Sequence, residues 1–318
     1  MDIKFSLLQA AFRWSFQNAF RSEKANRSED VHLEVTSDHM FWAQLEKRAN
    51  HFRLRVSSSM LTNTLEFWEN LATTKHSPAK GQPLSSASRS MHLLSLSWFV
   101  LHELSHINLG HFKLRNQFGV VHRKSEDFDS PELLPTAFRG NVIACLEMQA
   151  DHEATETLLG VYSSNNWQEL REKVLAISGM MILIEIEDTR NGAEGRTYPK
   201  AATRIFQLLG HLSEMPLIKA QLNKDPSFIL DENEVQSFVR EVTIPSFLDA
   251  FQLAQAAGAT HIESDLGSPE NFFKDMEIAK LGKPSHYADL KTQGAQEWAK
   301  LWPCNEALKP ILGGHFMT

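Results

Sequence analysis

Residues 102–106 have the sequence His-Glu-Leu-Ser-His, which brings two imidazoles and a carboxylate into one short segment. On an α-helix, positions i and i+4 share a face, so His102 and His106 can hold one metal ion between them. Glu103 would project beside them toward a water molecule activated by that ion. The motif therefore predicts a helix that carries part of a zinc site, with hydrolysis as its chemistry.

The residues around the motif favour a buried helix. Residues 91–101 form an apolar, helix-compatible run that leads directly into it. A serine-rich stretch before this run offers N-caps, and Gly110 lies where the helix would end. We therefore expect the motif near the inner end of a buried helix, where the exclusion of water strengthens electrostatic interactions.

A catalytic zinc ion usually has three protein ligands and an open position for water, so two histidines leave one ligand to be found. Glu147 is the best candidate, because residues 145–154 contain no Gly or Pro and should be helical. Asp151 lies one helical turn later on the same face. Glu147 can therefore bind the metal while Asp151 accepts the outer N–H of a liganding histidine and fixes its tautomer.

Together these segments resemble a known family. His-Glu-Leu-Ser-His at 102–106 and Glu-Met-Gln-Ala-Asp at 147–151 are similar to the paired motifs of the gluzincin metallopeptidases, particularly the branch with HtpX and the CAAX prenyl proteases. The resemblance covers about residues 91–160. It implies a role for each residue at a matching position: zinc ligands His102, His106 and Glu147, general base Glu103, and Asp151 as the carboxylate that orients a histidine.

A weaker similarity to the same enzymes follows in residues 197–205. Such enzymes often carry His-Pro there and then an Arg that opens a helix, whereas this chain has Tyr198 at the histidine position and Arg204 beyond it. By this resemblance, Tyr198 or Arg204 stabilises the oxyanion that forms in catalysis. A second interpretation stays open, in which Tyr198 and Pro199 only open a helix and Arg204 pairs with an acidic neighbour.

Three other reactive residues lie close to the motifs. His111 does not have the spacing of the third histidine in metzincins, so we do not expect it to bind zinc. His152 points roughly 100° away from Asp151 on a helix and is predicted to be a surface or packing residue. Cys145 lies on a different helical face from Glu147 and is predicted to be a buried structural thiol.

The HtpX branch is built into membranes, and this chain differs from it. Its longest apolar runs, residues 91–101 and 174–184, are shorter than the ~20 residues needed to span a bilayer. The N-terminus lacks the hydrophobic region and cleavage site of a signal peptide. The soluble Lit-type phage-exclusion and ImmA-type peptidases also carry His-Glu-x-x-His, and a Lit-like relationship fits this chain's length. We therefore expect a cytoplasmic protein without a transmembrane segment.

The composition limits the partners. The chain of 318 residues, 42% hydrophobic and 22% charged, is long enough to bury a sizeable core. Its net charge of -7 argues against a nucleic-acid partner, because phosphate-binding surfaces need clustered basic residues. The two cysteines, Cys145 and Cys304, favour a reducing compartment but leave a single disulfide open. The oligomeric state is not predicted.

Periodicity indicates how the rest of the chain is organised. Residues 4–20 predict an amphipathic helix packed on the core. Alternation in residues 31–35 and 52–56 predicts two strands of a small sheet, with a short helical stretch between them. That sheet either binds a substrate as an extra strand or serves only as a scaffold. Residues 74–90 and 113–137 predict long loops that flank the cleft as lids or are disordered.

The predicted fold class is α+β and mainly helical, with a zincin-like (gluzincin) core, a small N-terminal sheet and a helical C-terminal extension. Residues 137–211 are expected to form three helices. Residues 1–215 would be the metallopeptidase domain and residues 216–318 the extension, packed on the same domain. Its helices are expected to be broken at prolines, namely Pro226, Pro245, Pro269, Pro284 and Pro303.

The predicted function is that of a zinc-dependent endopeptidase with Zn2+ as its cofactor and a protein or peptide as its substrate. Glu103 would accept a proton from the metal-activated water and deliver it to the leaving amine. The alternative is a catalytically degenerate zincin-fold protein that senses a peptide or a metal ion in a binding or regulatory role.

Overall fold

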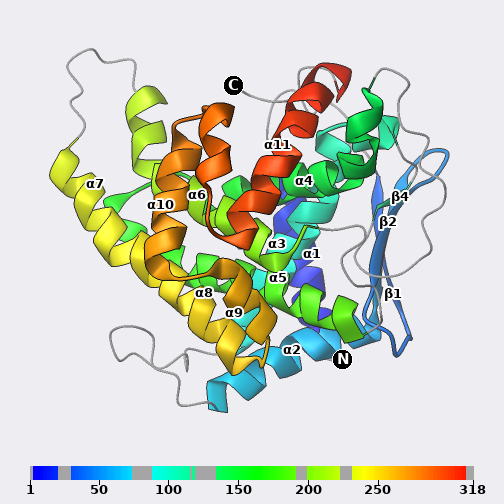
Figure 1. Cartoon of the computed structure of the whole chain (residues 1–318). Helices are drawn as coiled ribbons and strands as arrows, with labels where there is room; N and C mark the ends of the chain where they lie inside the picture. Colours follow the sequence, from blue (N-terminus) through cyan, green and yellow to red (C-terminus); the bar gives the residue numbers. More distant parts are fainter. Residues whose placement is uncertain are drawn as a thin grey trace.

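The computed structural model describes residues 3–20, 30–73, 88–114, 117–118, 134–190, 199–222 and 231–312. Helices make up most of this part of the chain, and a small sheet lies at one side of them (Figure 1). The α-helices are α1 (Ile3–Ala19), α2 (Ser58–Thr73), α3 (Ser88–Asn108), α4 (Val142–Leu159), α5 (Trp167–Arg190), α6 (Ala201–Leu222), α7 (Glu232–Phe238), α8 (Ile244–Ala256), α9 (Thr260–Leu266), α10 (Pro269–Lys280) and α11 (Gln293–Leu312). The predicted fold class, α+β and mainly helical, is confirmed.

Shorter elements connect these helices. The 3-10 turns are η1 (His111–Lys113), η2 (Thr136–Asn141), η3 (Ser164–Asn166) and η5 (Pro284–Asp289), and η4 (Val239–Thr243) is a π-helical turn between α7 and α8. The strands are β1 (Val31–Thr36), β2 (Ala43–Lys47), β3 (Phe52–Ser57) and β4 (Gln117–Phe118). Among the described residues they form one four-stranded sheet in the order β1-β3-β2-β4.

The sheet contains two strands that the sequence did not predict: β2, and β4 within the predicted loop of residues 113–137. The helical stretch expected between β1 and β3 is wrong, because β2 lies there and pairs antiparallel with β3. Ala43 and Leu45 are buried while Gln44 and Glu46 are less so, and this period of two fits a strand with one face on the core. Burial on the sheet therefore decided the structure of this short segment, and local propensity did not.

Helix α3 lies at the centre of the molecule. Nearly all of its residues from Met91 to His106 are buried, and it packs against α1, α2, α4 and α5. The predicted N-terminal helix does pack on the core: in α1 the Ser15 hydroxyl donates to the Ser97 carbonyl over 3.0 Å. The enclosed position of α3 agrees with the apolar run that leads into the motif.

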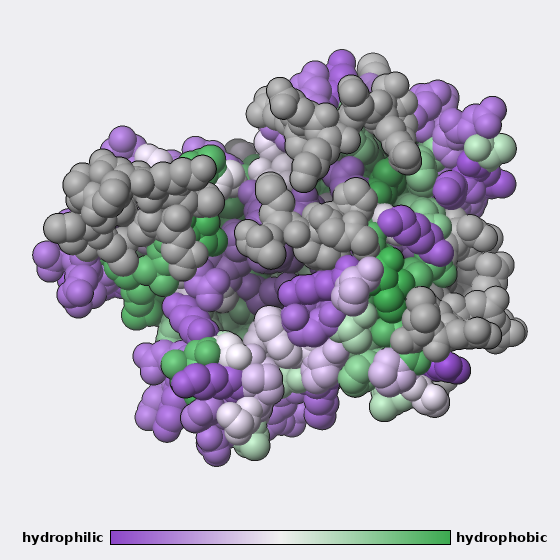
Figure 2. Space-filling view, turned by 90° about the horizontal axis from the view of Figure 1, so that it is seen from above, coloured by the Kyte–Doolittle hydropathy of each residue, from purple (hydrophilic) through white to green (hydrophobic). Residues whose placement is uncertain are grey.

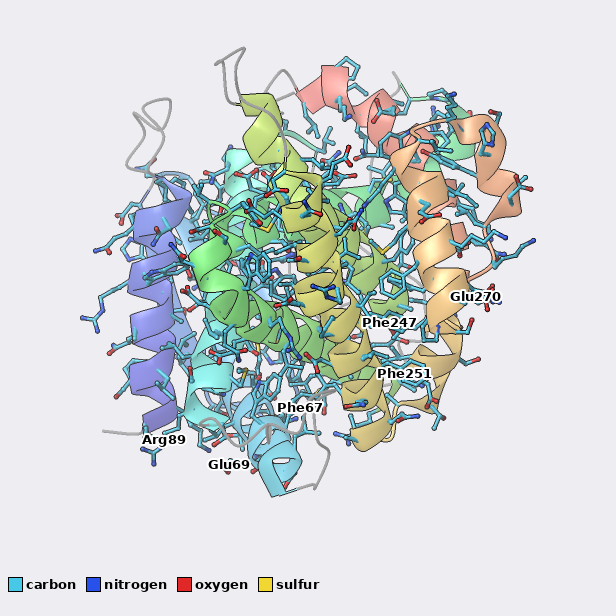
Figure 3. The ribbon with its side chains drawn as sticks, turned by 90° about the vertical axis from the view of Figure 1, so that its left-hand side faces the viewer. Phe67, Glu69, Arg89, Phe247, Phe251 and Glu270 are labelled. Carbon is cyan, nitrogen blue, oxygen red and sulfur yellow. The ribbon has the colours of Figure 1, made fainter. Side chains whose placement is uncertain are left out.

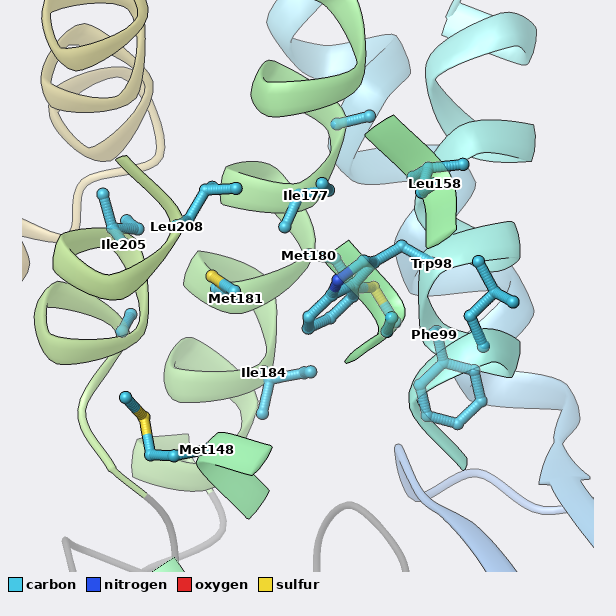
Figure 4. Close-up of a cluster of buried hydrophobic side chains, with 14 of the residues drawn as sticks. Trp98, Phe99, Met148, Leu158, Ile177, Met180, Met181, Ile184, Ile205 and Leu208 are labelled. Atoms are coloured by element: carbon cyan, nitrogen blue, oxygen red, sulfur yellow. The ribbon is translucent and has the colours of Figure 1, made fainter. Parts of the chain in front are cut away.

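One part of the core combines side chains of α3, α4, α5 and α6 (Figure 4). Trp98 and Phe99 of α3 are fully buried, and the Trp98 indole N–H donates to the Thr155 hydroxyl of α4 over 3.2 Å. Apolar side chains from α5, including Met180 and Ile184, fill the space beside them. This packing fixes the position of α4 relative to α3.

The three helices expected in residues 137–211 are α4, α5 and α6, so that prediction is confirmed. Helix α6 continues to Leu222 and thus runs through the predicted boundary at residue 215. The division into a domain and an extension stays a prediction. Helix α11 packs against α4 and α6, and it lies across them in Figure 1.

The prolines have two different effects in the C-terminal helices. Pro245 and Pro269 lie in the first turns of α8 and α10, and Pro284 lies at the start of η5, where a missing N–H costs little. Pro303 lies inside α11, so the expected break there is wrong. The side of α11 that carries Leu301 and Leu308 is buried on the core, and this packing keeps the helix continuous. Pro226 lies outside the described residues.

Aromatic side chains hold α8 to α10 on the side of the molecule shown in Figure 3. The Phe247 ring lies 4.5 Å from the Phe272 ring between their centroids, and Phe251 stands one turn beyond Phe247. The face in Figure 2 is mostly hydrophilic, with hydrophobic residues gathered in smaller patches. Among the described residues, every helix is too short or too polar to cross a lipid bilayer.

The two predicted loops lie mostly outside the described residues. Of residues 74–90, only 88–90 are described, and they form the first turn of α3. Of residues 113–137, the described ones are 113–114, 117–118 and 134–137. The lid role therefore stays a prediction.

Gly294 provides a test of how closely α11 packs on the core. A Cβ atom at Gly294 would lie 2.8 Å from the backbone oxygen of Ala202 in α6, and backbone cannot move aside cheaply. We expect Gly294→Ala to lower the free energy of unfolding by about 1–3 kcal/mol, measured by urea denaturation. The control is Gly210→Ala in α6, where a Cβ meets nothing within 4 Å. It should stabilise by about 0.5–1 kcal/mol. Equal effects of the two changes would contradict close packing at Gly294.

Candidate metal centre

Helices α3 and α4 bring His102, His106 and Glu147 together. The three side chains are buried, and one potential ligand atom from each lies within 4.8 Å of the others. The His102 Nε2 atom is 3.3 Å from the His106 Nε2 atom and 3.0 Å from the Glu147 Oε2 atom. The remaining distance, from His106 Nε2 to Glu147 Oε2, is 3.7 Å. The structure therefore assembles the three predicted ligands at one point.

Asp151 orients the first of these histidines. Its Oδ1 atom lies 2.8 Å from His102 Nδ1, so His102 donates its Nδ1–H to the carboxylate and directs Nε2 toward Glu147. Arg204 of α6 donates to both oxygens of Asp151, from Nε and from Nη2, over 2.7 Å each. A bidentate ion pair of this kind fixes the carboxylate and, through it, the imidazole plane.

The second histidine is oriented by residues that the sequence did not point to. The Gln149 amide N–H donates to Asn305 Oδ1 over 2.7 Å, so its oxygen accepts from His111 Nε2, 3.0 Å away. The Nδ1 atom of His111 then accepts from His106 Nδ1, which is 2.8 Å away. This chain of hydrogen bonds leaves a lone pair on His106 Nε2, and the Phe118 ring stacks on the His106 imidazole at 4.1 Å.

The electrostatics of the cluster favour a positive charge between these groups. Burial opposes the charged form of His102, yet Asp151 and Glu147 together raise its pKa to about 10. Burial also opposes ionisation of Glu147, but the neighbouring histidines hold its pKa well below its usual range. Two imidazole nitrogens and a carboxylate oxygen that converge in this way need a proton or a metal cation among them. The residues fit a metal ion.

Glu103 differs from the other polar groups in the cluster. It is fully buried, and neither carboxylate oxygen has a hydrogen-bond partner among the described residues. Burial raises the pKa of Glu103 to about 8, which makes its carboxylate a stronger base than an exposed one. In its ionised form, this carboxylate can take a proton from a molecule that enters the site.

The two remaining candidates have different outcomes. Tyr198 lies outside the described residues. Arg204 is buried, pairs with Asp151 and lies over the Trp98 ring at 5.5 Å, as in the interpretation that pairs it with an acidic neighbour. Cys145 and Cys304 are both free and buried, and the Cys145 thiol donates to the Leu301 carbonyl over 3.4 Å.

Sequence reasoning missed the support around His106. The only local signal for His111 is its position shortly after the motif, and its spacing does not match that of a third histidine ligand. Gln149 lies two residues after Glu147 in the chain, but nothing in the local sequence marks it as a functional residue. Asn305 is 156 residues from Gln149, so nothing in the local sequence could have paired them.

Comparisons with known proteins agree with a peptidase. The chain is 22% identical over 212 residues to the "Cell death peptidase" of Escherichia coli (strain K12), in an alignment that covers 64% of this chain and 61% of that protein. No solved structure matches the chain. Residues 11–217, which are more than half of the chain and contain α3, α4 and the start of α6, match the Peptidase U49 family. The chain belongs to the Peptidase U49 family.

Proposed function

We propose that this protein is a zinc-dependent endopeptidase in which His102, His106 and Glu147 bind the metal. The observation that carries the proposal is the convergence of two imidazole nitrogens and a carboxylate oxygen in a buried site. Family membership and the name of the E. coli relative support a peptidase. The substrate is then a protein or a peptide.

The geometry of the three ligand atoms supports zinc. With zinc–ligand bonds of about 2.0–2.2 Å, the atoms of a tetrahedral site lie about 3.3–3.5 Å apart. The three distances here are 3.0, 3.3 and 3.7 Å. The described residues supply three ligands and leave one position open for water or substrate, as in catalytic sites, whereas structural zinc sites are closed by a fourth ligand.

The residues around the site supply the remaining chemistry. When bound, zinc supplies a Lewis acid that lowers the pKa of a water molecule and polarises the scissile carbonyl. Glu103, the unpartnered carboxylate, accepts the proton of the attacking water and delivers it to the leaving amine. Asp151 and His111 hold the two imidazoles in the tautomer that directs both Nε2 atoms toward Glu147.

The sheet offers a place for the substrate backbone. Among the described residues, β4 is an edge strand, and its Phe118 stacks on His106. An extended peptide can bind along the edge of a sheet as an added strand. We propose that the substrate binds along this edge, which brings its scissile bond beside the metal ligands.

A regulatory protein that keeps the site without turnover is the competing function. Such a protein would hold one metal ion at this centre but would cleave no peptide. Any proteolysis in the sample would then be unaffected by a chelator. The unpartnered Glu103 favours the enzyme, because a site that only binds metal has no need for a buried base beside its ligands.

Glu103→Gln tests the proposed base. The change keeps the shape of the side chain and the metal ligands but removes the proton acceptor, so we expect normal folding and metal content with activity reduced by about 10²-fold or more. N-terminal labelling of proteins from cells that express the chain or this variant identifies substrates and measures turnover together. New N-termini that are equally abundant with the variant, or that persist when a chelator is added to the purified chain, would contradict the mechanism.

Glu147 and Asp151 should differ in their effect on the metal. Glu147→Ala removes a ligand and should abolish the anomalous-scattering peak of zinc beside His102. Asp151→Ala and His111→Ala remove only orienting partners and should weaken zinc binding by about 10- to 100-fold, measured by competition with a chelator. Glu147 would be excluded as a ligand if the zinc peak stays in place in Glu147→Ala. A peak several ångströms from the Glu147 carboxylate in the parent protein would exclude it as well.

Arg204 is expected to act through Asp151. Arg204→Ala leaves the Asp151 carboxylate buried without its main cationic partner, so the free energy of unfolding should fall by about 3–5 kcal/mol. Arg171→Ala is the matched control, since Arg171 pairs with Asp249 over 2.7 Å in a more exposed position away from the site. It should cost less stability and leave zinc affinity unchanged. An Arg204 variant with intact stability but lost turnover would instead place this guanidinium at the oxyanion.

A further inference from the structure

A second group of possible ligands lies on the next part of α4. His152 and Glu156 are one helical turn apart on α4, on a face rotated by about 100° from the one that carries Asp151. Opposite them on α6 stands His211. One ligand atom from each of the three residues lies within 4.8 Å of the others. We propose that His152, Glu156 and His211 bind a second divalent transition-metal ion.

The distances in this group suit a metal ion. Glu156 Oε1 lies 3.5 Å from His152 Nε2 and 4.0 Å from His211 Nδ1. In a tetrahedral zinc site the ligand atoms lie about 3.3–3.5 Å apart, so the first separation is in this range and the second is longer. The two imidazole rings stand edge to face, 5.1 Å apart.

The third ligand is held in place before any ion binds. His211 is on α6, which packs directly on α4, and its side chain is only 8% exposed. The side chains of His152 and Glu156 are 43% and 47% exposed, so an ion can enter from solvent on their side. One buried and two accessible ligands form a preorganised site with an entry path.

The types of ligand atom in this group decide which ions it would bind. Two imidazole nitrogens and one carboxylate oxygen favour Zn2+, Ni2+, Co2+ or Cu2+ over Mg2+ and Ca2+, which prefer oxygen ligands.

A metal ion at this position would also affect the packing of α6 on α4. His152 follows Asp151 in α4, and α6 carries both Arg204 and His211. An ion bound here links the same two helices that the Asp151–Arg204 ion pair joins. Its binding should therefore stabilise the contact between α4 and α6, whether or not the catalytic site is loaded.

The test is a metal titration of the full chain after it has been stripped with a chelator. Calorimetry with Zn2+ should find a site that is lost, or weakened by about ten-fold or more, in Glu156→Gln and in His152→Gln. Both residues are half-exposed, so these variants should fold normally. His261→Gln is the matched control, because His261 pairs with Glu185 over 2.9 Å on the surface but belongs to no three-ligand group among the described residues.

Anomalous scattering from crystals soaked in Zn2+ or Ni2+ then locates the ion. A peak between His152, Glu156 and His211 that is absent in Glu156→Gln confirms the site, even if His102 and His106 bind nothing. A zinc titration that is unchanged in both variants, or a peak confined to His102, His106 and Glu147, overturns it. Metal binding should raise the melting temperature of the parent protein and of His261→Gln. This rise should be lost in Glu156→Gln.

Discussion

The buried ion pair between Asp151 and Arg204 holds the rest of the site in place. An unpaired carboxylate at this depth would cost several kcal/mol, and Arg204 offsets that cost only if α6 stays against α4. The same carboxylate accepts the His102 N–H from α3. One residue thus joins three helices, and the direction of the His102 lone pair depends on all of them. Helix packing therefore determines the geometry of the proposed metal ligands.

A second polar network orients His106, and its members lie much further apart in the sequence. It passes through His111 and Gln149 to Asn305 of α11. Each member has a partner, and a buried network of this kind is stable only when all of its members are satisfied. The C-terminal helices therefore support the site as well as the core, although the family match ends at residue 217.

The sequence predicted those parts of the site that depend on local geometry. Spacing of i and i+4 on two helices was enough to place His102 with His106 and Glu147 with Asp151, because helix periodicity fixes those relations. It could not pair Gln149 with Asn305, which only tertiary packing brings together. For the same reason β2 and the continuous α11 were missed: burial on the sheet and on the core outweighed the local preferences of Gln44, Glu46 and Pro303.

Glu103 is the exception among these hydrogen-bonded side chains, and this contrast points to a functional role for it. In the cluster every histidine and both other carboxylates have hydrogen-bond partners, whereas both oxygens of Glu103 have none among the described residues. A leucine at this position would avoid the cost of burying that carboxylate and would suit the apolar surroundings of α3. A fold selected for stability alone would have no use for Glu103. Its position on the helix that carries both histidines fits the proposed role of Glu103, which is to accept a proton from a molecule that the folded chain itself does not contain.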